Sequence, residues 1–579
     1  MTNQQSVGAF TFVLHGHLPY VLSHGVWPHG MDWIFEAASE CYLPLLDAFT
    51  ALVEDGISPQ VTLGLTPVLT EQLRHPGFVA GFDDYLAQRI AAAAENAREF
   101  RQQQQPLLER LALRWRDEFT GIRARFHDCY GTDIPAAFRQ LMDDGHLEII
   151  TCAATHGYLP LLGDDTCVRA QIRQGVESYT RHYGRAPRGI WLPECAYRPA
   201  YAWKAPVEGA GPQRPVPRAG IEEILSDSGI QYFFVDTHLL MGGSTQGVYI
   251  ERFGALKALW EQAHATPGGE PAHFDHSPYR PYYVSGKYDG PAVSFYTREE
   301  RTGLQVWSGE HGYPGDGNYL DFHKKHYPGG HRYWKVTSAT ADLAEKLIYY
   351  PEDVEQRLDA NAEHFAWLVE TLLAEHPQPD APAFLTAPYD TELFGHWWYE
   401  GPRWIYRTLK RLHDGGRVTL RTAGDYLEQH PPAVGVALPE GSWGQGGFHW
   451  IWLNEWTAWT WKEVYKAEET MRALARDFAH SEDATLRRLL RQTARELLLL
   501  ESSDWQFLIS TWSARDYAEL RLQEHRDVFT RLAALARQYA ASGVLDAADL
   551  AFLETEERRD DLFPTIDPAW WVDPAPTAV

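Results

Sequence analysis

Seven short apolar segments, each followed by polar residues, constrain the fold of this chain more than any other feature of its sequence. They are rich in β-branched and aromatic side chains, as buried strands are, and the stretches between them are long enough for helices. The segments are 9–14, 61–65, 147–153, 189–192, 231–235, 292–296 and 383–387. Strands that alternate with helices form a parallel sheet, and closing that sheet gathers the polar strand ends at one mouth. The sequence therefore predicts an α/β fold, an incomplete (β/α)7 barrel.

An open, doubly wound sheet is the alternative arrangement. No G-x-G-x-x-G follows the first strand, which argues against it. The alanine-rich, polar stretch 85–130 is too long for one crossover helix and predicts a helical insertion. After residue 416 a glycine-rich loop carrying Trp443 leads into strongly helical segments. We therefore expect a barrel domain at 1–416 and an α-helical domain at 417–579, which brings its tryptophan loop over the barrel mouth.

Composition narrows the class of partner. The 579 residues include 52 basic and 78 acidic side chains, a net charge of −26, which argues against nucleic acid or an anionic membrane as partner. Five cysteines without C-x-x-C spacing favour a reducing compartment. The sequence shows neither a signal peptide nor an apolar run of the ~20 residues that a membrane span needs. We expect a cytoplasmic protein.

Two acids follow strands in matched contexts. Glu194 comes directly after Pro193 at the end of the fourth strand, and Asp390 comes two residues after Pro388 at the end of the seventh. Cleavage of a glycosidic bond needs one ionised and one protonated carboxyl group on opposite sides of that bond. An acid at a strand end can equally cap the next helix. The repeated strand–proline–acid pattern favours a catalytic pair whose members face each other across the mouth.

Histidines at the strand ends allow two interpretations. His15 and His17 follow the first strand, His156 the third, and Asp236 the fifth. These side chains can hold a zinc ion, as in a metal-dependent deacetylase, or they can bind sugar hydroxyls. The absence of an H-E-x-x-H motif or a cysteine-rich ligand set favours sugar contacts.

Tryptophans provide candidate platforms for pyranose rings. Although a single tryptophan is more often part of the core, several occur close to the predicted mouth. The candidates are Trp307, Trp397, Trp398, Trp443 and Trp452.

Longer motifs resemble the conserved regions of glycoside hydrolase family 57, and the C-terminal part resembles its 1,4-α-glucan branching enzymes. The resemblance covers nearly the whole chain. It rests on His15-Gly-His-Leu-Pro-Tyr20, Gly64-Leu-Thr-Pro67, Trp191-Leu-Pro-Glu-Cys-Ala-Tyr197, Gln305-Val-Trp-Ser308, Gly312-Tyr-Pro-Gly315, the segment from Ala387 to Gly401, the Gly441-Ser-Trp-Gly loop and Leu500-Glu-Ser-Ser-Asp-Trp505.

The resemblance implies a retaining enzyme with Glu194 as nucleophile and Asp390 as general acid/base, and with no metal or organic cofactor. It places Tyr249 on a flexible loop at the site. Substrate contacts are implied for His15, His156, Arg298, Gly315, Trp443, Trp452 and Asp504. Two departures concern the outer subsites: Ser513 stands where a sugar-contacting glutamine is expected, and 251–290 is longer than usual.

We therefore expect an enzyme that cuts an α-1,4-glucan and transfers the released segment to a 6-hydroxyl. A 4-α-glucanotransferase or an α-amylase is possible on the same site. Rivals from other classes are a metal-dependent deacetylase and a non-catalytic glucan-binding protein. The sequence does not specify the length of the transferred chain or the oligomeric state.

Overall fold

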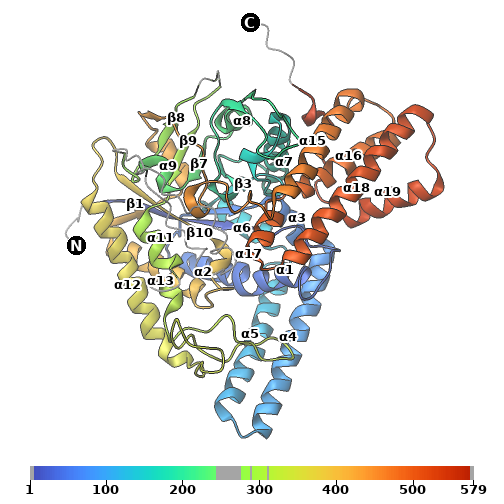
Figure 1. The fold of residues 1–579 in the computed structure, drawn as a ribbon. Helices are drawn as coiled ribbons and strands as arrows, with labels where there is room; N and C mark the ends of the chain where they lie inside the picture. The colour runs from blue at the N-terminus through green and yellow to red at the C-terminus, as the bar shows by residue number, and fades with distance from the viewer. Residues whose placement is uncertain (1–5, 243–275, 287, 289, 309–311, 574–579) are drawn as a thin grey trace.

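A curved sheet of parallel strands forms the centre of the protein. The computed structural model describes residues 6–242, 276–286, 288, 290–308 and 312–573 (Figure 1). Seven strands pair in parallel in the order β10-β1-β2-β3-β4-β7-β9. They are β1 (Gly8–Gly16), β2 (Val61–Leu65), β3 (Leu147–Cys152), β4 (Gly189–Trp191), β7 (Tyr232–Val235), β9 (Ser294–Thr297) and β10 (Ala383–Asp390).

The sheet curls into a barrel that is not fully closed. Its two ends, β9 and β10, are joined by the Thr386 hydroxyl, which donates to the Thr297 carbonyl at 2.8 Å. No strand ladder joins β9 to β10 within the described part of the chain. The predicted incomplete (β/α)7 barrel is therefore confirmed.

Alternation along β1 explains why the strand is buried on both faces. Successive side chains of a strand point to opposite sides. Phe10, Phe12 and Leu14 pack into the large core under the outer helices, whereas Ala9 and Val13 pack into a smaller core inside the barrel. This double burial is characteristic of parallel strands, because helices cover one face and the barrel interior the other.

Helices follow most of the parallel strands and form the outer layer. They include α2 (Leu43–Glu54), α3 (Pro67–Arg74), α6 (Ile134–Asp143), α7 (Asp165–Tyr183), α8 (Ile221–Asp227), α11 (Glu300–Trp307), α12 (Pro351–Glu375) and α13 (Gly401–Gly415). Shorter elements are α1 (Met31–Ala37), η1 (Ala38–Tyr42), β5 (Tyr201–Trp203), β6 (Val216–Arg218), α9 (Thr237–Met241) and β8 (Tyr282–Val284). None of the described helices combines the length and the apolar character needed to cross a bilayer.

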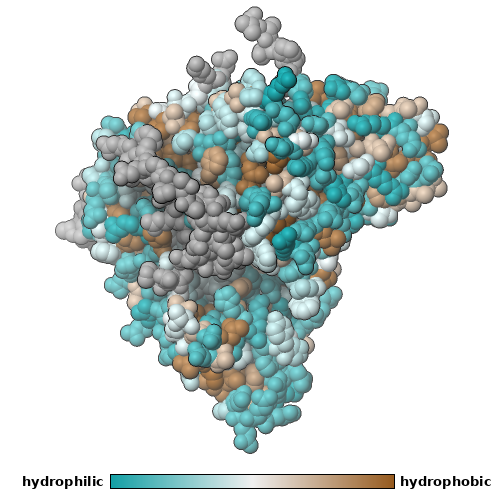
Figure 2. All heavy atoms as spheres, viewed as in Figure 1, coloured by the Kyte–Doolittle hydropathy of each residue, from teal (hydrophilic) through white to brown (hydrophobic). Residues whose placement is uncertain are grey.

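The region predicted as a helical insertion forms a hairpin of two long helices. These are α4 (Pro76–Gln102) and α5 (Pro106–Asp128), which pack side by side and project from the barrel (Figure 1). Apolar residues such as Phe82 and Phe126 face each other along the hairpin with ring centroids 5.0 Å apart. The tip is covered mainly by hydrophilic residues (Figure 2).

The C-terminal region is helical, but its first residues still belong to the sheet. β11 (Val418–Leu420) pairs with β1 and β12 (Gly435–Val436) with β8, and α14 (Ala423–Gln429) lies between them. The all-helical part thus begins after the position 417 chosen from the sequence, because strands of two or three residues show no periodicity. It comprises α15 (Ala458–Phe478), α16 (Ala484–Leu500), α17 (Asp504–Thr511), α18 (Arg515–Ser542) and α19 (Ala547–Arg559).

Candidate active site

Glu194 sits on a tight turn directly after β4. The strand ends at Trp191, and the turn Pro193–Cys195 carries left-handed backbone at Glu194 (φ 61°) and at Cys195 (φ 49°). Such angles are uncommon for residues other than glycine and cost free energy, so they occur where the surrounding structure fixes them. The turn directs an acid from the carboxyl end of the strand into the barrel mouth, where barrel enzymes place their chemistry.

A tryptophan from the C-terminal region holds the Glu194 carboxylate. The indole Nε1 of Trp443 donates to Glu194 Oε2 at 2.7 Å, and the Trp443 backbone N–H donates to the Glu194 carbonyl at 3.1 Å. Trp443 also packs edge-on against Trp191, with ring centroids 5.0 Å apart. The predicted stacking platform is therefore also a hydrogen-bond donor to the predicted nucleophile.

Asp390 is the last residue of β10 and lies in register with His15 of β1. The curved sheet brings it close enough to act electrostatically on Glu194. Burial raises the pKa of Glu194, the charge of Asp390 raises it further, and the hydrogen bond from Trp443 opposes both, giving a pKa of about 8. Near neutral pH the two carboxyl groups therefore retain a proton between them, as an acid/nucleophile pair requires.

Which member of the pair carries the proton depends on their hydrogen bonds. A donor bonded to a carboxylate stabilises its ionised form. Trp443 supplies such a donor to Glu194, and His156 Nδ1 lies 4.0 Å from Glu194 Oε1. The bond from Trp443 therefore favours the ionised form of Glu194, whereas burial and the charge of Asp390 favour the protonated form.

Three histidines and Asp504 form a hydrogen-bonded cluster beside Glu194. His15 Nε2 and His156 Nε2 are 3.0 Å apart, and the His17 ring stacks on His156 at 3.9 Å. His17 Nε2 lies 2.9 Å from Asp504 Oδ2, and His156 Nδ1 lies 2.8 Å from the Ser503 hydroxyl. Residues from β1, from the loop after β3 and from α17 thus meet at one point.

Burial determines the charge of this cluster. It lowers the pKa of His15 and of His156, and neighbouring histidines lower both further. Both rings are thus neutral near pH 7 and can donate or accept hydrogen bonds from hydroxyl groups. Burial works to raise the pKa of Asp504, but His17 outweighs it and the pKa is lowered, so this acid is ionised.

The same side chains are close enough to be considered as metal ligands. One ligand atom each from His17, His156 and Asp504, and one each from His15, Cys152 and His156, lie within 4.8 Å of one another. His17, His156 and Asp504 are types that bind zinc. Each already has a hydrogen-bond partner without an ion, since His17 bonds to Asp504 and His156 to His15 and Ser503. The predicted absence of a metal stays a prediction.

Arg298, which follows β9, pairs with Asp236, which follows β7. Its Nη2 is 2.9 Å from Asp236 Oδ1. Burial works to raise the pKa of Asp236, yet Arg298 and His238 lower it to about 2. Both groups are therefore charged, and the strand ends of β7 and β9 carry a fixed ion pair.

The structure places the other predicted tryptophans behind the site. Trp398 is 1% exposed among Tyr319, Phe394 and Trp404, so no face of its ring is open to a sugar, contrary to our prediction. The indole of Trp452 is equally buried and stacks on Tyr158 at 4.4 Å.

Trp452 also touches the loop of Trp443, since a Cβ at Gly444 would lie 2.6 Å from its ring. It thus supports that loop rather than forming an open platform. Trp307 is 3% exposed at the end of α11, and Trp397 is half-buried with its centroid 6.5 Å from that of Trp307. Sequence periodicity could not separate these buried rings from exposed ones.

Two predicted contacts are not tied to the carboxylates. Gly315 ends the short turn η5 (Tyr313–Gly315), and among the described residues its backbone N–H bonds to Gly312. Tyr249 lies outside the described residues, as does most of 251–290.

His17, considered at first only as part of a metal pair, and Ser503 were not predicted as sugar contacts. Their positions in the sequence could have indicated them, because His17 lies two residues after His15 and Ser503 directly precedes Asp504.

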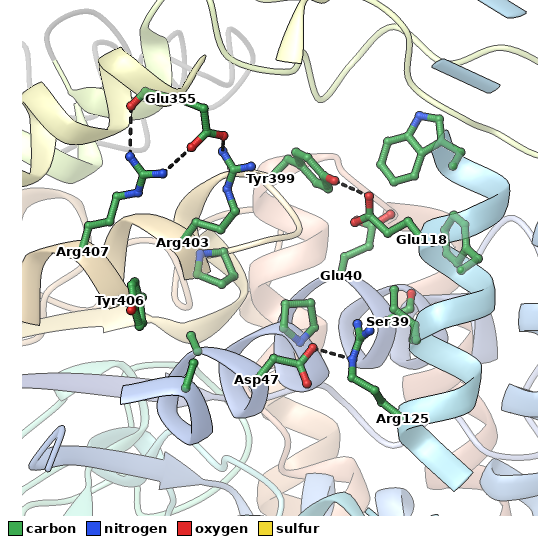
Figure 3. A pocket seen from close by; sticks show the side chains of 17 residues that line it. Ser39, Glu40, Asp47, Glu118, Arg125, Glu355, Tyr399, Arg403, Tyr406 and Arg407 are labelled. Atoms are coloured by element: carbon green, nitrogen blue, oxygen red, sulfur yellow. Dashed lines mark hydrogen bonds and ion pairs between the residues drawn. The ribbon is translucent and has the colours of Figure 1, made fainter. Parts of the chain in front are cut away.

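A second pocket of about 440 Å³ lies between α2, α5 and α13 (Figure 3). Its charged side chains pair with one another: Arg403 and Arg407 with Glu355, and Arg125 with Asp47 at 2.8 Å. Neither predicted catalytic acid lines it. We therefore place the candidate active site at the barrel mouth and not here.

Comparisons with known proteins agree with the geometry. The pattern of glycosyl hydrolase family 57 matches residues 11–439, and the pattern of the 1,4-alpha-glucan branching enzyme C-terminal region matches 463–571. The chain is 41% identical to a 1,4-alpha-glucan branching enzyme of Thermococcus kodakarensis over 558 residues, 96% of this chain and 77% of that enzyme. It is 31% identical to a probable 1,4-alpha-glucan branching enzyme of Mycobacterium tuberculosis, with 97% of both chains covered.

Solved structures give the same result. The crystal structure of the Thermococcus branching enzyme superposes with a TM-score of 0.87 at 40% identity, covering 98% of this chain and 97% of that one. An α-amylase of Thermotoga maritima superposes with a TM-score of 0.77 at 27% identity, covering 98% and 99%. The protein belongs to glycosyl hydrolase family 57.

Proposed function

We propose that the protein is a 1,4-α-glucan branching enzyme, which cleaves an α-1,4-glucan and transfers the released segment to a 6-hydroxyl. One observation carries this proposal. The C-terminal helices, which match the pattern of branching enzymes, deliver Asp504 to within 2.9 Å of His17 in the barrel mouth. The site is therefore built jointly by the barrel and a region typical of branching enzymes.

In the proposed mechanism Glu194 attacks the anomeric carbon while Asp390 gives its proton to the leaving oxygen. The C–O bond to the leaving glucan breaks, and a covalent glycosyl-enzyme forms. Asp390, now ionised, then takes the proton of an acceptor 6-hydroxyl as that oxygen displaces Glu194. Two inversions leave the α configuration unchanged.

Transfer requires that a sugar hydroxyl reaches the glycosyl-enzyme before water does. The buried His15 and His156 are neutral, so they can bind hydroxyl groups without attracting a hydration shell as charged groups do. Their burial, at 3% exposure each, supports the idea that the inner site excludes bulk water.

The experiment is incubation of the protein with amylose, followed by enzymatic debranching and sizing of the chains. New α-1,6 linkages with few new reducing ends would support branching. Many reducing ends without α-1,6 linkages would favour an α-amylase, which the likeness to the Thermotoga enzyme keeps as the second candidate. New α-1,4 chain lengths without branches would indicate a 4-α-glucanotransferase.

A further inference from the structure

We propose that Trp456 and Trp512 form an outer binding platform for a glucan chain of several glucose units, at the rim of the C-terminal wall of the site. This inference rests on the proposed function, since it assigns a place to the polymer beyond the catalytic carboxylates. The platform consists of these two rings and the neighbouring Arg515.

Exposure is the first argument. The Trp512 side chain is 54% exposed, although large aromatic side chains in this protein are mostly buried. Trp456 is half-buried beside it, with ring centroids 5.5 Å apart and planes inclined by 53°. The Arg515 guanidinium lies 5.5 Å from the Trp512 centroid. An exposed aromatic pair with an adjacent hydrogen-bond donor suits a pyranose, which has apolar faces and a hydroxyl rim.

The backbone at Trp512 is the second argument. The residue ends α17 with φ 58° and ψ 16°, the left-handed conformation in which helices usually end on glycine. A bulky side chain is unfavourable there, and the exposed ring does not fill the core. Neither local folding nor packing therefore accounts for a tryptophan at this position.

Continuity with the active site is the third argument. α17 begins at Asp504 in the histidine cluster and reaches Trp512 after eight residues, a rise of about 12 Å. The loop that begins with Trp443 at Glu194 continues through the buried Trp452 to Trp456. Asn454 fastens this loop to α17, because its Nδ2 donates to the Ser510 hydroxyl at 2.8 Å. Both segments thus start in the site and meet again at the aromatic pair.

The ion pair beside the two rings suits a neutral ligand. Arg515 is paired with Glu519 at 2.8 Å, so the platform carries no net charge from these two residues. Ser513, which replaces the expected glutamine, turns to Thr511 at 2.7 Å and leaves the tryptophan as the larger group at this rim. We assign the surface to an α-glucan segment that extends away from the carboxylates.

The test measures binding in a Glu194→Gln background, so that the glucan is not consumed. Trp512→Gly should keep the fold, because glycine favours the left-handed backbone. It should weaken amylose binding about five- to tenfold, the effect of losing one aromatic stacking contact. Maltotriose, short enough for the inner site, should change in affinity by less than twofold. Trp367→Ala removes an equally exposed tryptophan (55%) on α12 and serves as the matched control.

Unchanged amylose affinity in folded Trp512→Gly would overturn the platform, and so would an equal loss for amylose and maltotriose. Sedimentation of the wild-type protein and of the same variants completes the test. A wild-type dimer that Trp512→Gly loses, with unaltered glucan affinity, would assign the two tryptophans to a protein interface instead. Failure of the proposed function is distinguishable, because it would show as an absence of α-1,6 linkages with the wild-type protein, whatever the binding results.

Discussion

Replacing Trp443 by phenylalanine tests how far its hydrogen bond lowers the pKa of Glu194. The change retains a ring against Trp191 but removes the N–H that lies 2.7 Å from Glu194 Oε2. A hydrogen bond to a charged group contributes about 1.5–3 kcal/mol, which corresponds to roughly one to two pKa units. The donor stabilises the ionised form more than the protonated form, so its loss raises the pKa of Glu194 above about 8.

A higher pKa of Glu194 lowers the rate near neutral pH. Glu194 attacks only when ionised, and below its pKa each further unit lowers the ionised fraction about tenfold. We therefore expect kcat/KM near neutral pH to fall about ten- to a hundredfold. The acidic limb of the pH profile should move to higher pH by one to two units.

The assay uses an activated aryl α-glucoside, whose leaving group departs without a proton from Asp390. The profile then reports Glu194 alone. Trp115→Phe is the matched control, because its Nε1 donates to the Arg332 carbonyl at 2.7 Å, far from this bond. A lower rate with an unmoved acidic limb would refute the reasoning and leave Trp443 a packing residue.

Other predictions concern the same site. Glu194→Gln should abolish glycosyl-enzyme formation, and it should raise the melting temperature at pH 8 but not at pH 4. Folding raises the pKa of Glu194 from 4.5 to about 8, so this carboxyl group favours the folded state at low pH, and that contribution to stability is lost as the pH rises from 4.5 to 8. Calorimetry of both proteins at the two pH values measures the difference in melting temperature. Asp504→Asn removes the charge that pairs with His17 and should lower kcat by about tenfold. A wild-type kcat in this variant would exclude a positioning role for Asp504. Dialysis against a strong chelator should leave branching intact, whereas activity lost and then restored by zinc would favour the deacetylase. Tyr249→Ala should raise the number of reducing ends per α-1,6 linkage, and an unchanged ratio would place the water shield elsewhere.

Local sequence was sufficient to predict the strands and to place two acids near their ends. A buried parallel strand is apolar throughout, which makes the strand visible but not its limits: β4 ends at Trp191, before Pro193, and β10 continues through Pro388 to Asp390. Burial of single aromatics was not predictable in this way. Trp398 and Trp443 were both predicted as platforms for sugar rings, yet one lies in the core and the other bonds to Glu194, because burial depends on the elements that pack around each ring.

The sequence by itself determined the barrel, the helical C-terminal region and the presence of two acids at strand ends, since these depend on periodicity and on residue type at strand ends. Only the tertiary structure decided that Asp504 meets His17 across 487 residues of chain, and that the backbone of Glu194 is left-handed. It also decided that Asp390 raises the pKa of Glu194. These are long-range effects, because electrostatic and hydrogen-bond energies depend on distance in space, which the spacing of residues along a chain does not fix.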